Sequence, residues 1–107
     1  MTRYEYDKLV RNKIPEIIKS EGKIAEVRIA KNNEELLIYL GKKLVEEAIE
    51  YSENKDITEL VDILEVIFEI IKINNITYKE LDNLRNRKML ERGSFTKKTI
   101  LLAVKDK

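Results

Sequence analysis

The stretch EAIEYSENKDITELVD, residues 47–62, decides the fold of this chain. It holds two acidic pairs, Glu47/Glu50 and Glu59/Asp62, with a short polar turn between them. The members of each pair are three positions apart, and residues at that spacing lie on one face of an α-helix. The stretch therefore predicts two helices joined by a turn, each presenting one acidic pair.

The same turn predicts how the two pairs meet. With the turn centred near Lys55, residues whose numbers sum to about 110 lie level in an antiparallel hairpin. This register sets Glu50 opposite Glu59, and Glu47 opposite Asp62 or its neighbour. We therefore expect four carboxylates within about two turns of the hairpin.

Hydrophobic spacing predicts a helix on each side of the turn. The first runs from residue 33 to about 53, and Asn32 or Asn33 can cap it. The second runs from about 57 to 73, with Asp56 as its cap, and is apolar around roughly half its circumference or more. One partner helix cannot cover so wide an arc, so we expect several helices to bury it, with a second subunit among them.

Glycine, proline and capping residues delimit the rest of the chain. Pro15 opens a short helix that Gly22 ends. Thr77 caps a further helix, with Glu80 at the capping-box position, and Gly93 stops it. The chain shows no linker or repeat, so we expect one domain over residues 1–107.

Two segments outside these helices have weak strand character. Residues 24–30 alternate imperfectly between apolar and polar side chains, and residues 99–104 contain a continuous apolar run. They can pair as a small two-stranded sheet near 24–30 and 99–104. The predicted fold class is therefore mainly α, with this sheet as an addition.

Composition limits the chemistry. The 107 residues include no histidine and no cysteine, which excludes imidazole bases, disulfides and the usual zinc ligands. A metal must then be a hard ion on oxygen ligands, Mg²⁺ or alternatively Mn²⁺.

The net charge of +1 gives no general attraction to nucleic acid, and no apolar run is as long as a membrane span. We expect no stable nucleic-acid binding, no membrane partner and a cytoplasmic location, since no signal peptide is visible.

The acidic strip has a structural alternative. Glu46 falls on the far side of its helix and is expected to point to water, whereas Glu65 and Glu69 extend the strip as outer members. Charged helix faces are often only solvated, and Lys43 with Glu47 is a plain i,i+4 pair. A nearly all-acidic strip opposite another acidic pair nevertheless needs a compensating cation, which favours a divalent ion.

The motifs resemble a known family. The form ExxE…ExxD over 47–62 is similar to the MazG-like branch of the all-α nucleoside triphosphate pyrophosphohydrolases. The opening YDKLVRNKIPEII, residues 6–18, and the closing RKMLERGSF, residues 87–95, resemble a house-cleaning, phosphoribosyl-ATP pyrophosphohydrolase-like subgroup. Asn12 departs from the aspartate expected in the opening motif, which leaves the role of that position open.

The resemblance implies a fold and a reaction. The fold would be a helical bundle assembled as a homodimer or homotetramer. The reaction would be Mg²⁺-dependent hydrolysis of nucleoside triphosphates, non-standard or damaged ones among them, to the monophosphate and pyrophosphate. The resemblance implies that the catalytic and metal-binding residues are Glu47, Glu50, Glu59 and Asp62, and that the phosphate-binding residues are Lys8, Arg11, Lys13, Lys88 and Arg92.

Two alternatives compete with this reading. Phosphoribosyl-ATP pyrophosphohydrolases share the helical core, so phosphoribosyl-ATP is a rival substrate. A non-catalytic helical module for oligomerisation would explain the wide apolar arc without any chemistry. The intact acidic quartet favours an enzyme.

Overall fold

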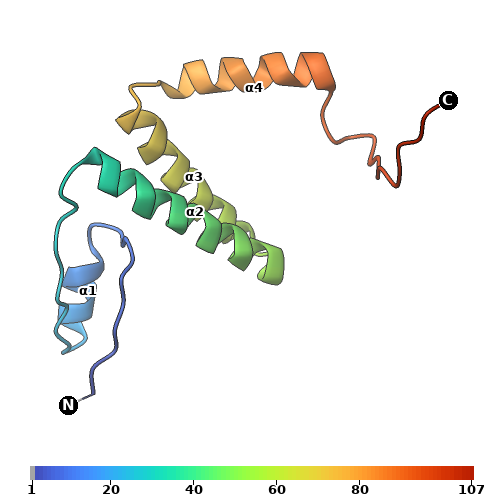
Figure 1. Cartoon of the computed structure of the whole chain (residues 1–107). Helices are drawn as coiled ribbons and strands as arrows, with labels where there is room; N and C mark the ends of the chain where they lie inside the picture. Colours follow the sequence, from blue (N-terminus) through green and yellow to red (C-terminus); the bar gives the residue numbers. More distant parts are fainter. Residues whose placement is uncertain (1) are drawn as a thin grey trace. The chain divides into compact units, whose positions relative to one another are not determined.

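The computed structural model describes residues 2–107, which form four α-helices and no strand (Figure 1). The helices are α1 (Ile14–Ser20), α2 (Asn33–Asn54), α3 (Ile57–Ile73) and α4 (Tyr78–Arg92). The fold class is therefore mainly α, as predicted. None of the described helices combines the length and apolarity needed to cross a membrane.

The chain divides into two compact units, with the boundary between Asn75 and Ile76. The first unit contains α1, α2 and α3, and the second contains α4 and the C-terminal segment. Each unit has its own internal contacts. A single domain over the whole chain stays a prediction.

The hairpin of α2 and α3 is defined by its caps. The Asn32 side chain accepts a hydrogen bond from the Glu35 amide at 2.9 Å, which starts α2. Lys55 ends α2 with φ of 56°, in the left-handed region. The Asp56 side chain then accepts from the Thr58 amide at 3.0 Å and starts α3. One left-handed residue followed by one cap thus reverses the chain, and the predicted turn is confirmed.

The other two helices also begin and end at the predicted residues. Pro15 lies in the first turn of α1, and Gly22, with φ of 80°, follows its end. The Thr77 hydroxyl accepts from the Glu80 amide at 3.1 Å at the start of α4. Gly93 ends α4 with φ of 86°, a conformation that side-chain-bearing residues rarely adopt.

The core of the first unit lies between α2 and α3, which run antiparallel and pack along each other (Figure 1). Within residues 2–107 the buried apolar side chains are Leu40 on α2 and Val66 and Ile71 on α3. The only other buried side chain in that range is a charged one, Glu47. The hairpin therefore encloses a small apolar core and a carboxylate.

Both hairpin helices also expose apolar side chains. On α2, Ile38, Val45 and Ile49 share one face and are 52–58% exposed; we call them the α2 stripe. On α3, Val61 and Leu64 are 61% and 44% exposed and lie on one face; we call them the α3 stripe. The wide apolar arc expected on the second hairpin helix is thus largely exposed in the single chain.

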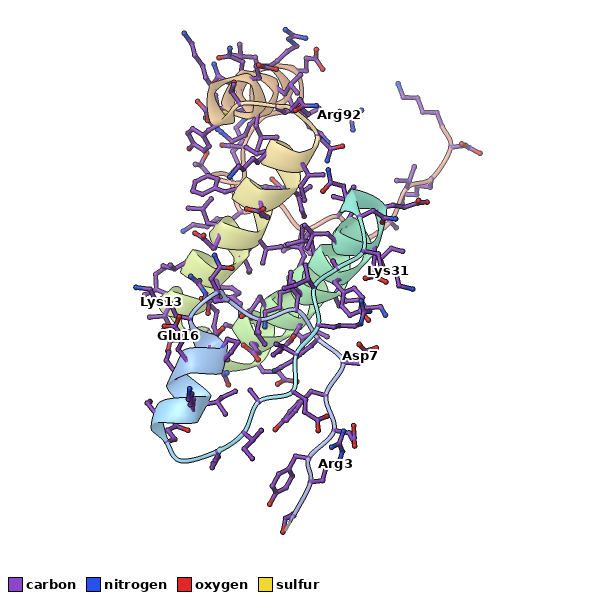
Figure 2. All side chains as sticks on the ribbon, turned by 90° about the vertical axis from the view of Figure 1, so that its left-hand side faces the viewer. Arg3, Asp7, Lys13, Glu16, Lys31 and Arg92 are labelled. Atoms are coloured by element: carbon purple, nitrogen blue, oxygen red, sulfur yellow. The ribbon has the colours of Figure 1, made fainter. Side chains whose placement is uncertain are left out.

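Side chains hold the N-terminal segment, residues 2–13, against the rest of the first unit. Figure 2 shows Arg3 and Asp7 along this segment. Arg3 pairs with Glu26 through two hydrogen bonds of 2.9 and 2.8 Å. The Tyr39 hydroxyl of α2 donates to Asp7 Oδ1 at 2.6 Å. These contacts set the segment beside α2.

The predicted two-stranded sheet is not formed, since no strand occurs within residues 2–107. Side-chain contacts hold residues 24–30 instead: Arg28 pairs with Glu35 at 2.6 Å on α2. Residues 99–104 run without secondary structure. The physical reason is that two short strands without a covered apolar face gain little from pairing, and the alternation in 24–30 is imperfect.

Candidate metal centre

Three carboxylates converge between the hairpin helices. Glu47 and Glu50 belong to α2 and Glu59 to α3, and one oxygen from each lies within 4.8 Å of the other two. Two oxygens on opposite sides of one Mg²⁺ stand about 4.2 Å apart, so the observed spacing is close to that of a ligand set. The counted register, with Glu50 opposite Glu59, is confirmed.

Glu47 is the most unusual member of this group. Glu47 is only 6% exposed, and its Oε1 lies 3.4 Å from Lys43 Nζ. Its Oε2 is inaccessible to solvent and has no hydrogen-bond partner in the described residues, and the same is true of Glu59 Oε2. A buried carboxylate oxygen without a partner is costly. A bound cation would satisfy both oxygens.

The pKa values of Glu47 and Glu59 are both raised, as expected for carboxyl groups that lie close together. Burial, followed by the charge of Glu50, raises the pKa of Glu47, although Lys43 opposes this shift. A side-chain hydrogen bond with Glu50 is the largest cause that raises the pKa of Glu59 to about 7, and desolvation adds to it. Close acidic groups cannot all ionise without compensation. The raised pKa values of Glu47 and Glu59 reflect the cost of ionising the group, which a divalent cation would offset.

Asp62, the fourth predicted member, lies at the edge of the group. It is not among the three clustered carboxylates, yet its charge contributes to the raised pKa of Glu47. Its Oδ1 accepts a hydrogen bond from Arg11 Nη2 at 2.7 Å. The structure thus brings together three of the four predicted acids and gives the fourth an arginine partner. The assignment of Asp62 as a metal ligand stays a prediction.

The other acids of the strip lie outside the group. Glu46 is 3.6 Å from both Lys8 and Lys43, so it is paired rather than simply pointing to water. Glu65 and Glu69 are exposed and do not belong to the clustered carboxylates. Exclusion of Glu46 from the site is consistent with its predicted position on the helix.

The predicted phosphate-binding residues fall in both units. Arg11 forms an ion pair with Asp62 at the edge of the carboxylate cluster. Lys8 forms an ion pair with Glu46, the residue that precedes Glu47. Lys13 is exposed at the start of α1 (Figure 2). Lys88 and Arg92 are exposed on α4, in the second unit, where their spacing places them on one face. Their phosphate-binding role stays a prediction.

Two contacts beside the site were not predicted from the sequence. The Arg11–Asp62 pair joins residues 51 positions apart, so no local spacing signals it. The Tyr39–Asp7 hydrogen bond is similarly long-range. Asn12, adjacent to Arg11, is exposed, and its side chain makes no hydrogen bond within residues 2–107.

Comparison with known proteins adds no relative: no family model, curated protein or solved structure matches the chain. The geometry itself defines the class of site, an all-oxygen acidic cluster between two antiparallel helices. Such donors suit hard divalent cations.

Proposed function

We propose that this chain is a Mg²⁺-dependent nucleoside triphosphate pyrophosphohydrolase, acting on non-standard or damaged nucleotides among its substrates. The observation that carries the proposal is the buried Glu47 carboxylate, whose unpartnered oxygen lies in a cluster with Glu50 and Glu59. The motif resemblance supplies the substrate class.

The residues fit the proposed metal. Carboxylate oxygens are the ligands that Mg²⁺ prefers, and Mn²⁺ accepts the same set. Glu47, Glu50 and Glu59 would hold the ion, with Asp62 beside them. When bound, the ion would neutralise phosphate charge and lower the pKa of a water molecule.

The proposed reaction is balanced by one water molecule. The water oxygen forms a bond to the α-phosphorus, and the bond from that phosphorus to the α–β bridging oxygen breaks. Pyrophosphate leaves with the bridging oxygen, and the water proton passes to a carboxylate of the cluster or to solvent. Phosphoryl transfer requires mainly positioning and charge neutralisation from the protein, which a chain without histidine can provide.

The basic residues complete the proposal. Lys8 and Arg11 lie on the segment that contacts the site, and Lys13 follows them. We assign these three residues to the phosphates; the same assignment for Lys88 and Arg92 of α4 rests on the motif resemblance alone. Arginine grips phosphate oxygens bidentately, whereas lysine acts as a point charge.

The exposed stripes support assembly of the proposed enzyme. A second copy that buried the α2 and α3 stripes would remove several large apolar side chains from water, each contributing about 1.5–3 kcal/mol when fully buried. We therefore propose a homodimer or homotetramer; a cytoplasmic location is a separate proposal.

The test is a hydrolysis screen of common and damaged nucleoside triphosphates, together with phosphoribosyl-ATP, in the presence of Mg²⁺ or Mn²⁺. Monophosphate and pyrophosphate are measured. Glu59→Gln should abolish release while retaining the circular dichroism of the native chain. Glu69→Gln is the matched control, because it removes an exposed acid from the same helix.

The outcomes separate the alternatives. Preferential cleavage of phosphoribosyl-ATP would replace the proposed substrate class with that rival. Absence of pyrophosphate release from every nucleotide would favour the non-catalytic module.

A further inference from the structure

The contact between Arg11 and Asp62 gives the candidate metal centre a cation of its own. We propose that Arg11 competes with a divalent metal ion for Asp62, and that metal binding frees the guanidinium for the triphosphate. This inference rests on the proposed function and adds an order to it: metal first, nucleotide second.

Arg11 and a metal ion in the carboxylate cluster would be attracted to the same acid. Glu47, Glu50 and Glu59 form the cluster, and Asp62 is near enough for its charge to affect Glu47. Arg11 Nη2 lies 2.7 Å from Asp62 Oδ1 and neutralises that one acid. A divalent ion among the three glutamates would attract the Asp62 carboxylate, and the ion and the guanidinium would then compete for the same negative charge.

The Arg11–Asp62 ion pair is accessible to water. The side chains of Arg11 and Asp62 are 53% and 39% exposed. An ion pair so accessible to water contributes little net free energy. Its exchange for a metal contact is therefore inexpensive, and the displaced guanidinium can be solvated at once.

Other contacts hold the segment that carries Arg11 beside α2. The Tyr39 hydroxyl donates to Asp7 at 2.6 Å, and Lys8 lies 3.6 Å from Glu46, so two contacts to α2 hold the segment that precedes Arg11. They do not involve Asp62. After release, Arg11 stays close to the site at a high effective concentration. It is then available to grip phosphate oxygens bidentately.

The experiment measures Mn²⁺ binding without nucleotide, by electron paramagnetic resonance titration of the full chain. Arg11→Gln should bind Mn²⁺ about two- to fivefold more tightly, the size expected when an exposed ion pair no longer competes. Lys13→Gln is the matched control: it removes a neighbouring positive charge that has no acidic partner within residues 2–107. Its Mn²⁺ affinity should equal that of the unsubstituted chain.

A double-mutant cycle isolates the contact. In an Asp62→Asn background, Arg11→Gln should give no further gain in Mn²⁺ affinity, because the shared acid is gone. Arg11→Lys, which keeps the charge, should show a smaller gain than Arg11→Gln. Equal affinity of Arg11→Gln and the unsubstituted chain, or the same gain with and without Asp62, would overturn the inference.

Activity supplies the second readout. Arg11→Gln should lower kcat/KM for triphosphate hydrolysis even though it binds the metal more tightly. If Mn²⁺ binds and pyrophosphate is released, but the cycle is additive, only the competition fails. If the unsubstituted chain binds no Mn²⁺, the proposed function fails and the competition fails with it.

Discussion

The carboxyl groups of Glu50 on α2 and Glu59 on α3 approach each other across the hairpin, with an oxygen of each within 4.8 Å of the other. This contact is the largest cause that raises the pKa of Glu59 to about 7. Carboxyl groups this close favour a proton on Glu59, because two like charges in one place cost free energy. The site therefore exchanges a proton near neutral pH, and its stability and cation affinity should both depend on pH.

The metal-free chain should lose stability as the pH rises from about 4.5 to about 7. The pKa of Glu59 is raised in the folded state, so the folded state binds more protons than the unfolded state in this window. The contribution of Glu59 to stability is fully present below the pKa that this residue has in the unfolded chain. It is lost as the pH rises through the pKa of Glu59 in the folded chain, about 7. Thermal melts in EDTA from pH 5 to pH 8 measure the slope of the melting temperature against pH.

Glu59→Gln should reduce that slope, and Glu69→Gln should leave it unchanged. Some slope should remain, because the pKa of Glu47 is also raised. The acids with lowered pKa values, such as Glu35 and Asp56, are mostly ionised in both the folded and the unfolded state over the upper part of this window, and they contribute little to the slope there. A full slope in Glu59→Gln would contradict the assignment.

At pH 8 without metal, Glu59→Gln should melt at a higher temperature than the unsubstituted chain. The substitution relieves repulsion among three clustered carboxylates. Asp62→Asn should give no such rise, because it deprives Arg11 of its ion-pair partner. Calorimetry of the two variants side by side decides the matter, and a lower melting temperature for Glu59→Gln would sink the repulsion argument.

Mg²⁺ or Mn²⁺ should raise the melting temperature more at pH 8 than at pH 5.5. Binding to the folded state alone stabilises it by about 1.4 kcal/mol when the free metal is at tenfold its Kd. At pH 5.5 the proton held by Glu59 competes with the ion. Differential scanning fluorimetry checks this, with reversal by EDTA as the control; an equal shift at both pH values would argue against the carboxylate cluster as the binding site.

Asp56→Ala should destabilise the hairpin by about 1 kcal/mol, since its side chain accepts the Thr58 amide at the start of α3. Urea denaturation measures the change in the free energy of unfolding. Asp106→Ala, in the exposed C-terminal segment, is the control and should change stability by less than about 0.5 kcal/mol. Equal effects of the two substitutions would show that the cap does not hold the turn.

Val61→Glu should dissociate the proposed oligomer without unfolding the chain. Val61 is 61% exposed in the single chain, so a charge there costs little unless a second copy covers it. Val27→Glu is the matched control, because Val27 is 64% exposed and lies outside the hairpin. Light scattering coupled to size-exclusion chromatography measures the mass; a mass of one chain before substitution would refute the assembly.

The sequence by itself determined the helices and their ends. Helix boundaries depend on interactions within a few residues, so the sequence alone predicts them. Here they are the caps at Asn32, Asp56 and Thr77 and the glycines after α1 and α4. The short turn near Lys55 also fixed the register, and with it the approach of Glu50 to Glu59. These features depend on spacing alone.

The tertiary structure decided which groups satisfy the site. The pairing of Arg11 with Asp62 and of Tyr39 with Asp7 joins distant positions, and no periodicity encodes such contacts. The burial of Glu47 likewise depends on what packs around it. The predicted sheet failed for the same reason, since strand pairing requires a partner and a covered face that local alternation cannot supply.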